Sequence, residues 1–490
     1  MSVLSPPRAV SSASLRGVVE EQPLRYPDTT SRPFMTKRGW WLVGLNFLLP
    51  GSAQVLAGNR RLGRFGIGAT LAMWALVIVH LLAVALWRTG LIGFYTGAWI
   101  PDALSLLRPL PLLVAQGVLI AYAVLWVVLT IDTLRLVRLV RTGSFARFGI
   151  ALVSIALLVL SSWGAVWASE RVGTARDTLT TIFGASAASV PPSDGYYNIL
   201  LLGADSGEGR DSMRFDSISV VSVNADTGAV TITGIPRDMP HFPFADGPMK
   251  ELYPDVHAGH TDQTCGWGSG INQLRTEVEV CRDGDSLYPD AADHGSTPAV
   301  EATKDAAEGI LGIEIPYYVF IDMHGFAALV DALGGVDINV VERLPEGGGP
   351  EWDGQPVEDW ATGWIEPGQQ HMNGDTAQWY ARSRYTTSDF DRMRRQRELQ
   401  AAILAQFTPT TVLTRFNEIA VAGTAIVETD LPQSMLPYFA DLAVKAKEQP
   451  VSTIELTPDG GVDEFEPDYA YVQQLIQTTL HPPSPSPSEG

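Results

Sequence analysis

Three long apolar runs constrain this chain more than any other feature of its sequence. They are Phe65–Trp87, Pro109–Ile131 and Phe148–Ala168, each more than 20 residues long and nearly free of charge. A helix of that length crosses a hydrocarbon core of roughly 30 Å. One such run could be a buried helix of a soluble protein, but three of them within residues 65–168 predict three transmembrane helices.

A fourth apolar stretch, Trp40–Ala57, is shorter, and four residues interrupt it: Asn46, Pro50, Gly51 and Gln54. Polar backbone and side-chain groups at membrane depth need internal partners, so the sequence favours a broken, re-entrant or interfacial hairpin over a straight span. We therefore predict residues 1–64 to be a cytoplasmic N-terminal segment that contains this hairpin.

Basic residues set the orientation. The loop 132–147 carries Arg135, Arg138, Arg141 and Arg147, and the segment before the first run is also basic. The positive-inside rule places both in the cytoplasm, and three crossings then carry everything after residue 169 to the outside. A full fourth span at 40–57 would instead place the N-terminus outside the cytoplasm. Residues 1–30 lack a cleavable signal peptide. We expect a multi-pass cell-membrane protein with an extracytoplasmic C-terminal domain.

The charge is divided unevenly along the chain. Residues 1–169 hold 15 Lys and Arg against 5 Asp and Glu, whereas the remainder holds 19 against 49, which together give the net charge of −20. An acidic outer domain argues against nucleic-acid binding because a duplex would repel it. The acidic excess itself is typical of a solvated surface.

The two cysteines, Cys265 and Cys281, both lie in the predicted outer domain. A single pair in an oxidising compartment favours a disulfide, with two buried free thiols as the alternative. His257 and His260 lie nearby, next to acidic residues, and form either a metal loop or a solvated polar loop.

Beyond the apolar runs, strands alternate with helices, which predicts a layered α/β domain. Residues 199–202, 217–223, 229–235, 317–321 and 336–340 have the pattern of strands, and residues 301–311, 326–333, 376–380 and 391–407 that of helices. We divide this part into a connector at 169–195, a catalytic domain at 196–410, a C-terminal part at 411–480 and a disordered, proline- and serine-rich tail at 481–490.

Three charged clusters follow the ends of these elements. Asp205 comes after the first strand with Arg214 and Asp216 before the next; Arg237-Asp238 ends the hairpin; and the third cluster holds Arg382, Arg384, Asp389, Asp391, Arg392, Arg395 and Gln396. Arginine forks neutralise phosphates, and carboxylates hold Mg²⁺ together with substrate phosphates. The pattern indicates phosphoryl or pyrophosphoryl chemistry, although an arginine-rich helix can also be solvated and ion-paired.

Several ordered motifs resemble the LytR-CpsA-Psr family, over about residues 196–410. They are Asn198–Asp205, Arg214–Asp216, Ile235–Asp238, Ile313–Val319, Val330–Val336, Gly368–Gly374, Tyr380–Arg384 and Asp391–Gln396. The resemblance implies an α/β fold with a hydrophobic cleft for a polyprenyl chain. It also implies a phosphotransferase that moves a glycopolymer from a polyprenyl-pyrophosphate carrier onto peptidoglycan.

The resemblance also implies a site. Asp205 and Asp216 match metal-associated carboxylates, which predicts Mg²⁺, or Mn²⁺ in its place. The candidate pyrophosphate-binding residues are Arg214, Arg237, Arg382, Arg384, Arg392, Arg395 and Gln396. Asp205, Asp216, Arg237, Asp238 and Asp391 are the candidate catalytic residues, and Asp238, Asp389 and Asp391 are candidates for the general base.

The chain departs from the family pattern in two places. Ser206-Gly207 follows Asp205 where the family often has an arginine, and the long region 239–275 keeps only Ile271-Asn272 of a family motif. The same residues could serve a polyprenyl-pyrophosphate phosphatase, or a non-catalytic regulator of the cell envelope. An ATP-binding P-loop is not predicted, because the sequence has no Gly-x-x-x-x-Gly-Lys-Ser/Thr.

Overall fold

The computed structural model describes residues 23–183, 189–204, 214–406, 411, 415–447, 449–463 and 465–482. The described residues divide into two compact units. One contains the residues up to Leu91 together with Leu110–Gly173, and the other contains Ile92–Pro109 together with the residues from Thr174 onward. The predicted tail at 481–490 lies outside the described residues except for its first two positions.

The first unit is helical. Its elements are α2 (Arg32–Leu48), α3 (Ser52–Ala57), α4 (Arg60–Leu86), α6 (Leu110–Val137), the short turn η2 (Leu139–Arg141) and α7 (Ala146–Ile182) up to Gly173. Between α4 and α6 in the sequence lie α5 (Arg88–Thr96), whose residues from Ile92 onward belong to the second unit, and η1 (Asp102–Leu107), which belongs to the second unit entirely. By length and composition, α4, α6 with its flanking turns, and α7 could each cross a membrane. The prediction of three apolar helices is therefore confirmed.

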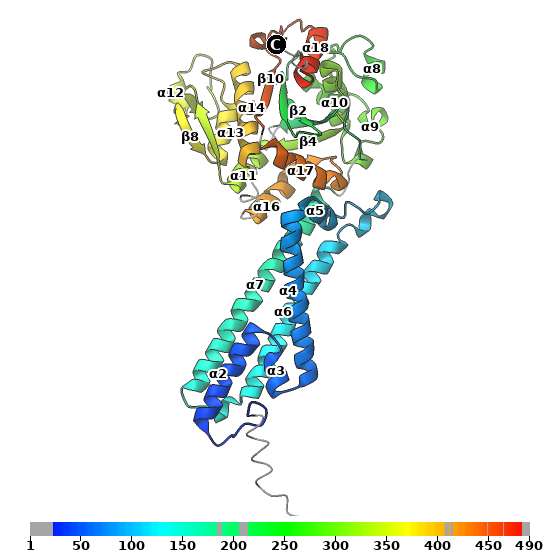
Figure 1. Cartoon of the computed structure of the whole chain (residues 1–490). Helices are drawn as coiled ribbons and strands as arrows, with labels where there is room; N and C mark the ends of the chain where they lie inside the picture. The colour runs from blue at the N-terminus through cyan, green and yellow to red at the C-terminus, as the bar shows by residue number, and fades with distance from the viewer. Residues whose placement is uncertain are drawn as a thin grey trace, which may run out of the picture. The chain divides into compact units, whose positions relative to one another are not determined.

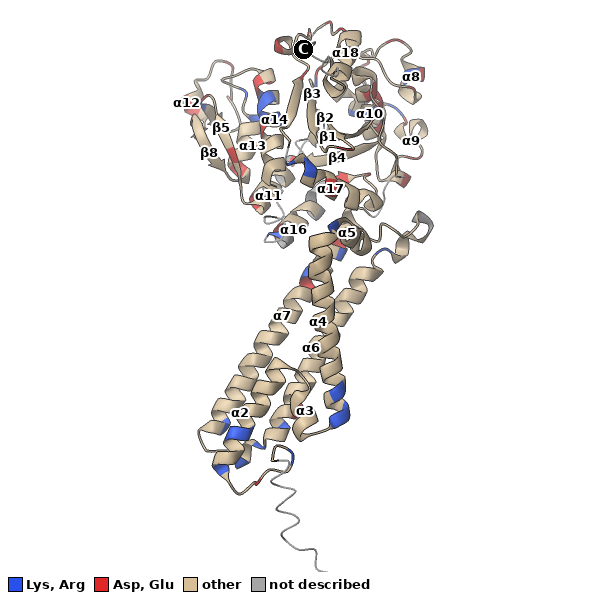
Figure 2. Cartoon of the chain, in the orientation of Figure 1, with Lys and Arg blue, Asp and Glu red and all other residues tan. Residues whose placement is uncertain are grey.

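Helix α7 differs from the prediction at its C-terminal end, because it continues to Ile182. Most of the predicted connector at 169–195 is therefore helical. Its residues Glu170, Arg171 and Arg176 are polar but have good helix propensity, and this segment lacks the apolar signal on which the prediction rested. Figure 2 shows the Lys and Arg residues of the helical unit gathered where α2 and α4 begin.

The interrupted stretch at 40–57 is a pair of helices, α2 and α3, which meet at a break around Gly51. Gly51 has a φ of +99°, and a Cβ there would lie 2.5 Å from the carbonyl oxygen of Gly63, so only glycine fits. The polar residues of the stretch bond internally: Asn46 accepts from Gly51, and buried Gln54 donates to the Leu129 carbonyl at 2.8 Å. Its depth in a membrane stays a prediction.

The second unit is built on a six-stranded sheet with the order β10-β3-β2-β1-β4-β9 (Figure 1). The strands are β1 (Tyr196–Ala204), β2 (Phe215–Asn224), β3 (Val230–Ile235), β4 (Tyr317–Asp322), β9 (Val427–Thr429) and β10 (Ser452–Glu455). Strand β1 pairs antiparallel with β2 and parallel with β4, while β2 and β3 form the predicted hairpin. The mixed α/β class is thus confirmed.

Helices cover both faces of this sheet (Figure 1). On β1, Leu200, Leu202 and Ala204 enter the main core with α10 (Pro298–Leu311) and α18 (Tyr469–Leu480). The alternate residues of β1 point to the other face, as strand geometry requires, where α14 (Asp389–Gln406) and α17 (Leu436–Ala446) pack. The strand ends therefore emerge between two helical layers.

A smaller lobe adjoins the sheet and has its own core. Its elements are α11 (Met323–Leu333), β5 (Val336–Val340), β6 (Leu344–Glu346), α12 (Val357–Trp360), β7 (Gly363–Ile365), β8 (Gly368–Met372) and α13 (Gly374–Arg382). Strand β5 pairs with β8, and β6 pairs with β7. Through α13 and the start of α14 this lobe carries the third charged cluster.

The C-terminal part, predicted separately as 411–480, is integral to the sheet because it supplies both edge strands, β9 and β10. Just after β9, buried Asp430 accepts from Lys304 of α10 and from the backbone N–H of Tyr318. The remaining elements are α8 (Pro248–Leu252), η3 (Ile271–Gln273), η4 (Thr276–Cys281), α9 (Gly284–Leu287), η5 (Ala292–His294), α16 (Phe416–Ile426), η6 (Gln433–Met435) and η7 (Pro458–Gly460).

Candidate functional site

Asp216 lies in an irregularity at the start of β2. The β1–β2 register shifts there, so that Gly203 is opposite Ser217 while Ala204 is opposite Phe215, and Asp216 has no partner on β1. A β-bulge of this kind redirects a side chain at a sheet end and is common beside functional sites. The Asp216 carboxylate is about one third exposed and pairs with Arg237.

Arg237 follows β3 in the turn that begins at Pro236. Its Nη1 pairs with Oδ1 of Asp216, and its Nε lies 3.4 Å from Oδ2 of Asp238, which is an ion pair but too poorly directed for a hydrogen bond. Burial alone would lower the pKa of Arg237, but the carboxylates of Asp216 and Asp238 outweigh burial and raise that pKa. Arg237 therefore stays a cation.

Arg392 lies in the first turns of α14, and its side chain is 7 % exposed. One Nη donates to Asp389 at 3.0 Å, while Nε is buried without a hydrogen-bond partner among the described residues. A buried donor without a partner is costly, which makes this side chain suited to receive an anionic ligand. Burial lowers the pKa of Arg392, and Asp389 partly opposes that shift.

The predicted residues converge although they come from distant segments. The charges of Arg237 and Asp216 act directly on Arg392, and so does that of Arg384. The site therefore combines the start of β2, the end of β3, the turn after α13 and the start of α14. Two cations with incomplete hydrogen bonding, Arg237 and Arg392, lie at its centre, where an anion would complete them.

The other predicted residues are placed less centrally. Arg384 is exposed in the turn after α13, and Arg214 is exposed just before β2. Arg382 ends α13 with its guanidinium over the Trp379 ring at 5.3 Å. Asp205 lies outside the described residues.

Two predicted residues form hydrogen bonds that stabilise the local fold. Arg395 is buried, and its guanidinium donates to the backbone carbonyls of Tyr380 and Ser383, so it fixes the turn between α13 and α14. Asp391 accepts from the backbone N–H and the hydroxyl of Ser388, and these bonds lower its pKa. A low pKa makes Asp391 a poor general base, whereas Asp238 and Asp389 lie beside the arginine pair.

An apolar cavity of about 240 Å³ begins beside this cluster, between the sheet and α14. Its lining is mostly aliphatic, and Ser217, Gln396 and Gln400 contribute its polar side chains. Helix α14 lines the cavity with Gln396, Leu399, Gln400, Ile403 and Leu404, and Arg392 lies one helical turn before Gln396. The Oε1 of Gln396 is buried and, within the described part of the chain, lacks a partner.

The predicted metal needs oxygen ligands from the side chains at the site. In the described ranges, no group of three or more His, Cys, Asp and Glu residues could hold an ion. Mg²⁺, however, commonly binds through one or two carboxylates, with water and substrate phosphates completing its shell. Asp216, one-third exposed next to the arginine pair, is a donor of this kind, so the site fits a metal that arrives with a phosphate ligand.

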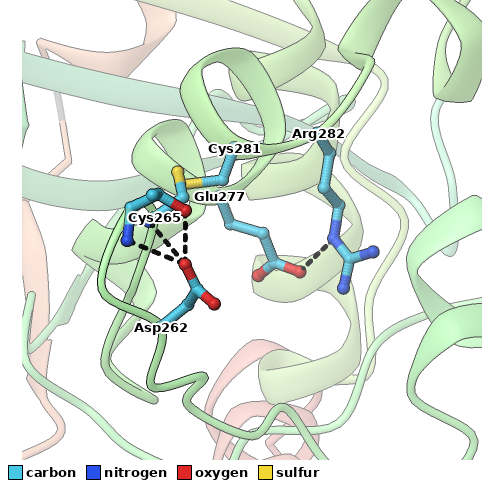
Figure 3. Close-up of a disulfide and its surroundings, with 6 residues drawn as sticks. Asp262, Cys265, Glu277, Cys281 and Arg282 are labelled. Atoms are coloured by element: carbon cyan, nitrogen blue, oxygen red, sulfur yellow. Dashed lines mark hydrogen bonds and ion pairs between the residues drawn. A yellow bond between two sulfur atoms is a disulfide. The ribbon is translucent and has the colours of Figure 1, made fainter.

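The structure joins Cys265 and Cys281 in a disulfide (Figure 3). It also corrects the interpretation of the neighbouring histidines. His257 is fully buried and pairs with buried Glu277 at 2.8 Å, so it lies in neither a metal loop nor a solvated one. His260 is exposed and stacks near Trp267, with ring centroids 4.8 Å apart.

Sequence reasoning missed two buried groups beside the site. Arg397 on α14 is 1 % exposed and lies 3.9 Å from Glu455 on β10. Asn272, which the sequence marked only as the remnant of a motif, bonds directly to Asp238 at 2.8 Å. The position of Arg397 within the helix could have signalled burial, because Arg397 follows buried Met393 by four residues.

Fold and site together define a mixed α/β domain in which a pair of arginines lies beside an apolar cavity. The LytR_cpsA_psr family model matches residues 169–241 and 292–481, and the chain therefore belongs to this family. The resemblance seen in the sequence is confirmed.

Curated relatives are similar over part of their length. The chain is 26 % identical to the polyisoprenyl-teichoic acid–peptidoglycan teichoic acid transferase TagU of Bacillus mycoides, over 49 % of this chain and 62 % of that protein. It is 24 % identical to the cell wall biosynthesis protein LcpA of Corynebacterium glutamicum, over 70 % of this chain and 66 % of that protein. It is 26 % identical to biofilm regulatory protein A of Streptococcus mutans, over 48 % and 50 %. The chain thus spans half to two thirds of these relatives.

Among solved structures, Bacillus subtilis TagV is 22 % identical with a TM-score of 0.39, over 58 % of this chain and 97 % of that one. A structure of TagT bound to LIIa-WTA is 18 % identical with a TM-score of 0.38, over 61 % and 96 %.

Proposed function

We propose that this chain transfers a glycopolymer from a polyprenyl-pyrophosphate carrier onto peptidoglycan. The observation that carries the proposal is the pair of partly buried Arg237 and buried Arg392 beside an apolar cavity. A lipid-linked pyrophosphate is complementary to both parts, because it joins a dianionic head to an apolar chain. Family membership and the name of the TagU relative support this class of reaction.

The chemistry follows from the charges. A sugar hydroxyl of the acceptor attacks the phosphorus next to the glycan, the bond from that phosphorus to the bridging oxygen breaks, and polyprenyl phosphate leaves. Arg237 and Arg392 neutralise the charge that gathers on the departing phosphate. Asp238 or Asp389, both beside the arginine pair, takes the hydroxyl proton.

Mg²⁺, or Mn²⁺ in its place, would be held by Asp216 together with Asp205. When bound, the ion supplies further neutralisation of the pyrophosphate charge. Arg237 pairs with Asp216, so this carboxylate is held beside the arginine without a ligand.

The decisive experiment incubates the purified protein with a synthetic lipid-linked pyrophosphate donor, with and without peptidoglycan fragments. We expect glycopolymer to become attached to the fragments, with polyprenyl phosphate as the second product. Release of free glycopolymer phosphate at the same rate with and without fragments would instead make the protein a phosphatase. An unchanged donor in both arms would contradict either enzymatic function.

We further propose that α4, α6 and α7 anchor the chain in the cell membrane as a multi-pass protein, with the domain from residue 196 outside the cytoplasm. The apolar length of these helices and the basic residues at 132–147 support this orientation. A reporter that is active only outside the cytoplasm should work when fused after Val190 and be silent when fused at Thr142. The opposite pattern would reverse the orientation.

A further inference from the structure

The segment between the two matched parts of the family model has a structural role at the site. The match stops at residue 241 and resumes at 292, so residues 242–291 lie between its two parts. This segment contains both cysteines of the chain and carries α8, η3, η4 and α9.

A buried polar cluster fixes this segment to the domain. His257 stacks on Phe242 with ring centroids 4.9 Å apart, and its two ring nitrogens lie 3.0 Å from the Ser269 carbonyl and 2.8 Å from Glu277. Glu277 also accepts from Tyr253 at 2.7 Å. It accepts from Arg282 at 2.8 Å as well (Figure 3). Three donors thus bond to one buried carboxylate, which makes this cluster rigid.

The disulfide closes the loop Cys265–Cys281, which contains Glu277 of this cluster. Cys265 and Cys281 are 16 positions apart with their Cα atoms at 5.6 Å. Asp262 orders the turn that leads into the loop, because it accepts from the backbone N–H groups of Thr264 and Cys265 (Figure 3). Cross-linking its two ends removes much of the conformational freedom of the loop.

Asn272, within this loop, contacts the arginine site. The backbone N–H of Asn272 donates to the Arg237 carbonyl at 2.9 Å, and the Asn272 side-chain amide donates to Oδ1 of Asp238 at 2.8 Å. Asn272 is 4 % exposed, and a Cβ at Gly270 would lie 3.2 Å from the Asp238 Cα, so the approach is close. The other oxygen of Asp238 faces Nε of Arg237.

We propose that the disulfide-closed loop Cys265–Cys281 positions the pyrophosphate site, with Asn272 orienting Asp238 and Asp238 in turn orienting the Arg237 guanidinium. Asn272 is thus a positioning residue. The thiol–disulfide state of the loop determines how strongly Asn272 restricts the orientation of Asp238. The proposal rests on the proposed transfer function and adds a second element, outside the matched family segments, on which that function depends.

The first test is a double-mutant cycle. Asn272→Ala should lower transfer roughly tenfold, the effect of losing one hydrogen bond to a charged group. In an Asp238→Asn background the same change should have much less effect, because its target is already altered. A role in folding alone would give additive losses and a lower melting temperature for Asn272→Ala, and would overturn the proposal.

The second test concerns the disulfide. The variant Cys265→Ser with Cys281→Ser should lower transfer several-fold, and adding it to Asn272→Ala should change nothing further. If the double serine variant does not fold, reductant can replace it, because the chain has no other cysteines on which reductant could act. Wild-type rates that are unaffected by opening the disulfide would refute the coupling.

Two controls separate this inference from the proposed function. Asn339→Ala changes an exposed asparagine on β5 and should be neutral. Arg392→Ala should abolish most transfer whatever the loop does. Loss of transfer in Arg392→Ala with full activity in Asn272→Ala would reject the positioning role and leave the transferase; full activity in both would reject the arginine site as well.

Discussion

Arg392→Ala is expected to lower the rate of glycopolymer transfer roughly 10- to 150-fold, which corresponds to the loss of about 1.5–3 kcal/mol from one charge-assisted hydrogen bond. Its guanidinium is 7 % exposed with a buried Nε that has no partner among the described residues. A donor phosphate would supply that partner, so truncation leaves phosphate charge unneutralised in a partly dry site. Asp389 loses its ion pair but is more than one third exposed, so the fold should survive.

Arg237→Ala should have a loss of similar size by a different route. It removes a cation and leaves Asp216 and Asp238 without their arginine, so two carboxylates then repel the phosphate. Rates are measured with purified protein, a lipid-linked donor and peptidoglycan fragments, and circular dichroism checks the fold. Arg343→Ala is the matched control, because Arg343 pairs with Glu366 at the surface, where such pairs contribute little. Wild-type rates in both site variants would show that the pyrophosphate site lies elsewhere.

Asp430→Ala is expected to lower the free energy of unfolding by about 3–5 kcal/mol, the usual cost of removing one partner from a buried ion pair. Asp430 is 1 % exposed and is bonded to Lys304, whose side chain is 9 % exposed. Without Asp430, Lys304 keeps Glu301, the Pro316 carbonyl and its contact with the Tyr318 ring. The backbone N–H of Tyr318 loses its acceptor.

Urea unfolding of the domain that begins at residue 196, followed by tryptophan fluorescence, measures this effect. Asp337→Ala serves as the control, because Asp337 pairs with His371 at the surface, both residues being more than 60 % exposed. A change below about 1 kcal/mol in Asp430→Ala, the size expected for a surface pair, would mean that the Lys304 pair is not buried as described.

Much of the fold followed from periodicity. Strands β1, β2 and β3 and helices α10 and α14 were predicted within a few residues, because each has a run long enough to repeat its pattern. Strands β9 and β10 were not predicted. They have three and four residues, too few for a period, and become strands by pairing with β4 and β3. Such pairing depends on tertiary contacts that a local pattern does not contain.

The candidate site was predicted in its position more than in its detail. Asp216, Arg237 and Arg392 each follow or precede an apolar element, and the structure brings them together. The direction of Arg395 depends on where the carbonyls of the α13–α14 turn point, which residue types do not determine. The contact of Asn272 with Asp238 joins positions 34 residues apart, and no local pattern in the sequence between them indicates it.

The strand order has a consequence for synthesis of the chain. A ribosome delivers β1 to β4 well before β9 and β10, which border the sheet on opposite sides. Until those late segments arrive, β3 and β4 present open hydrogen-bonding edges, and unpaired edges recruit other strands. A premature stop shortly after α14 would therefore uncover both margins at once, and the truncated protein would be prone to self-association even with every arginine of the site present.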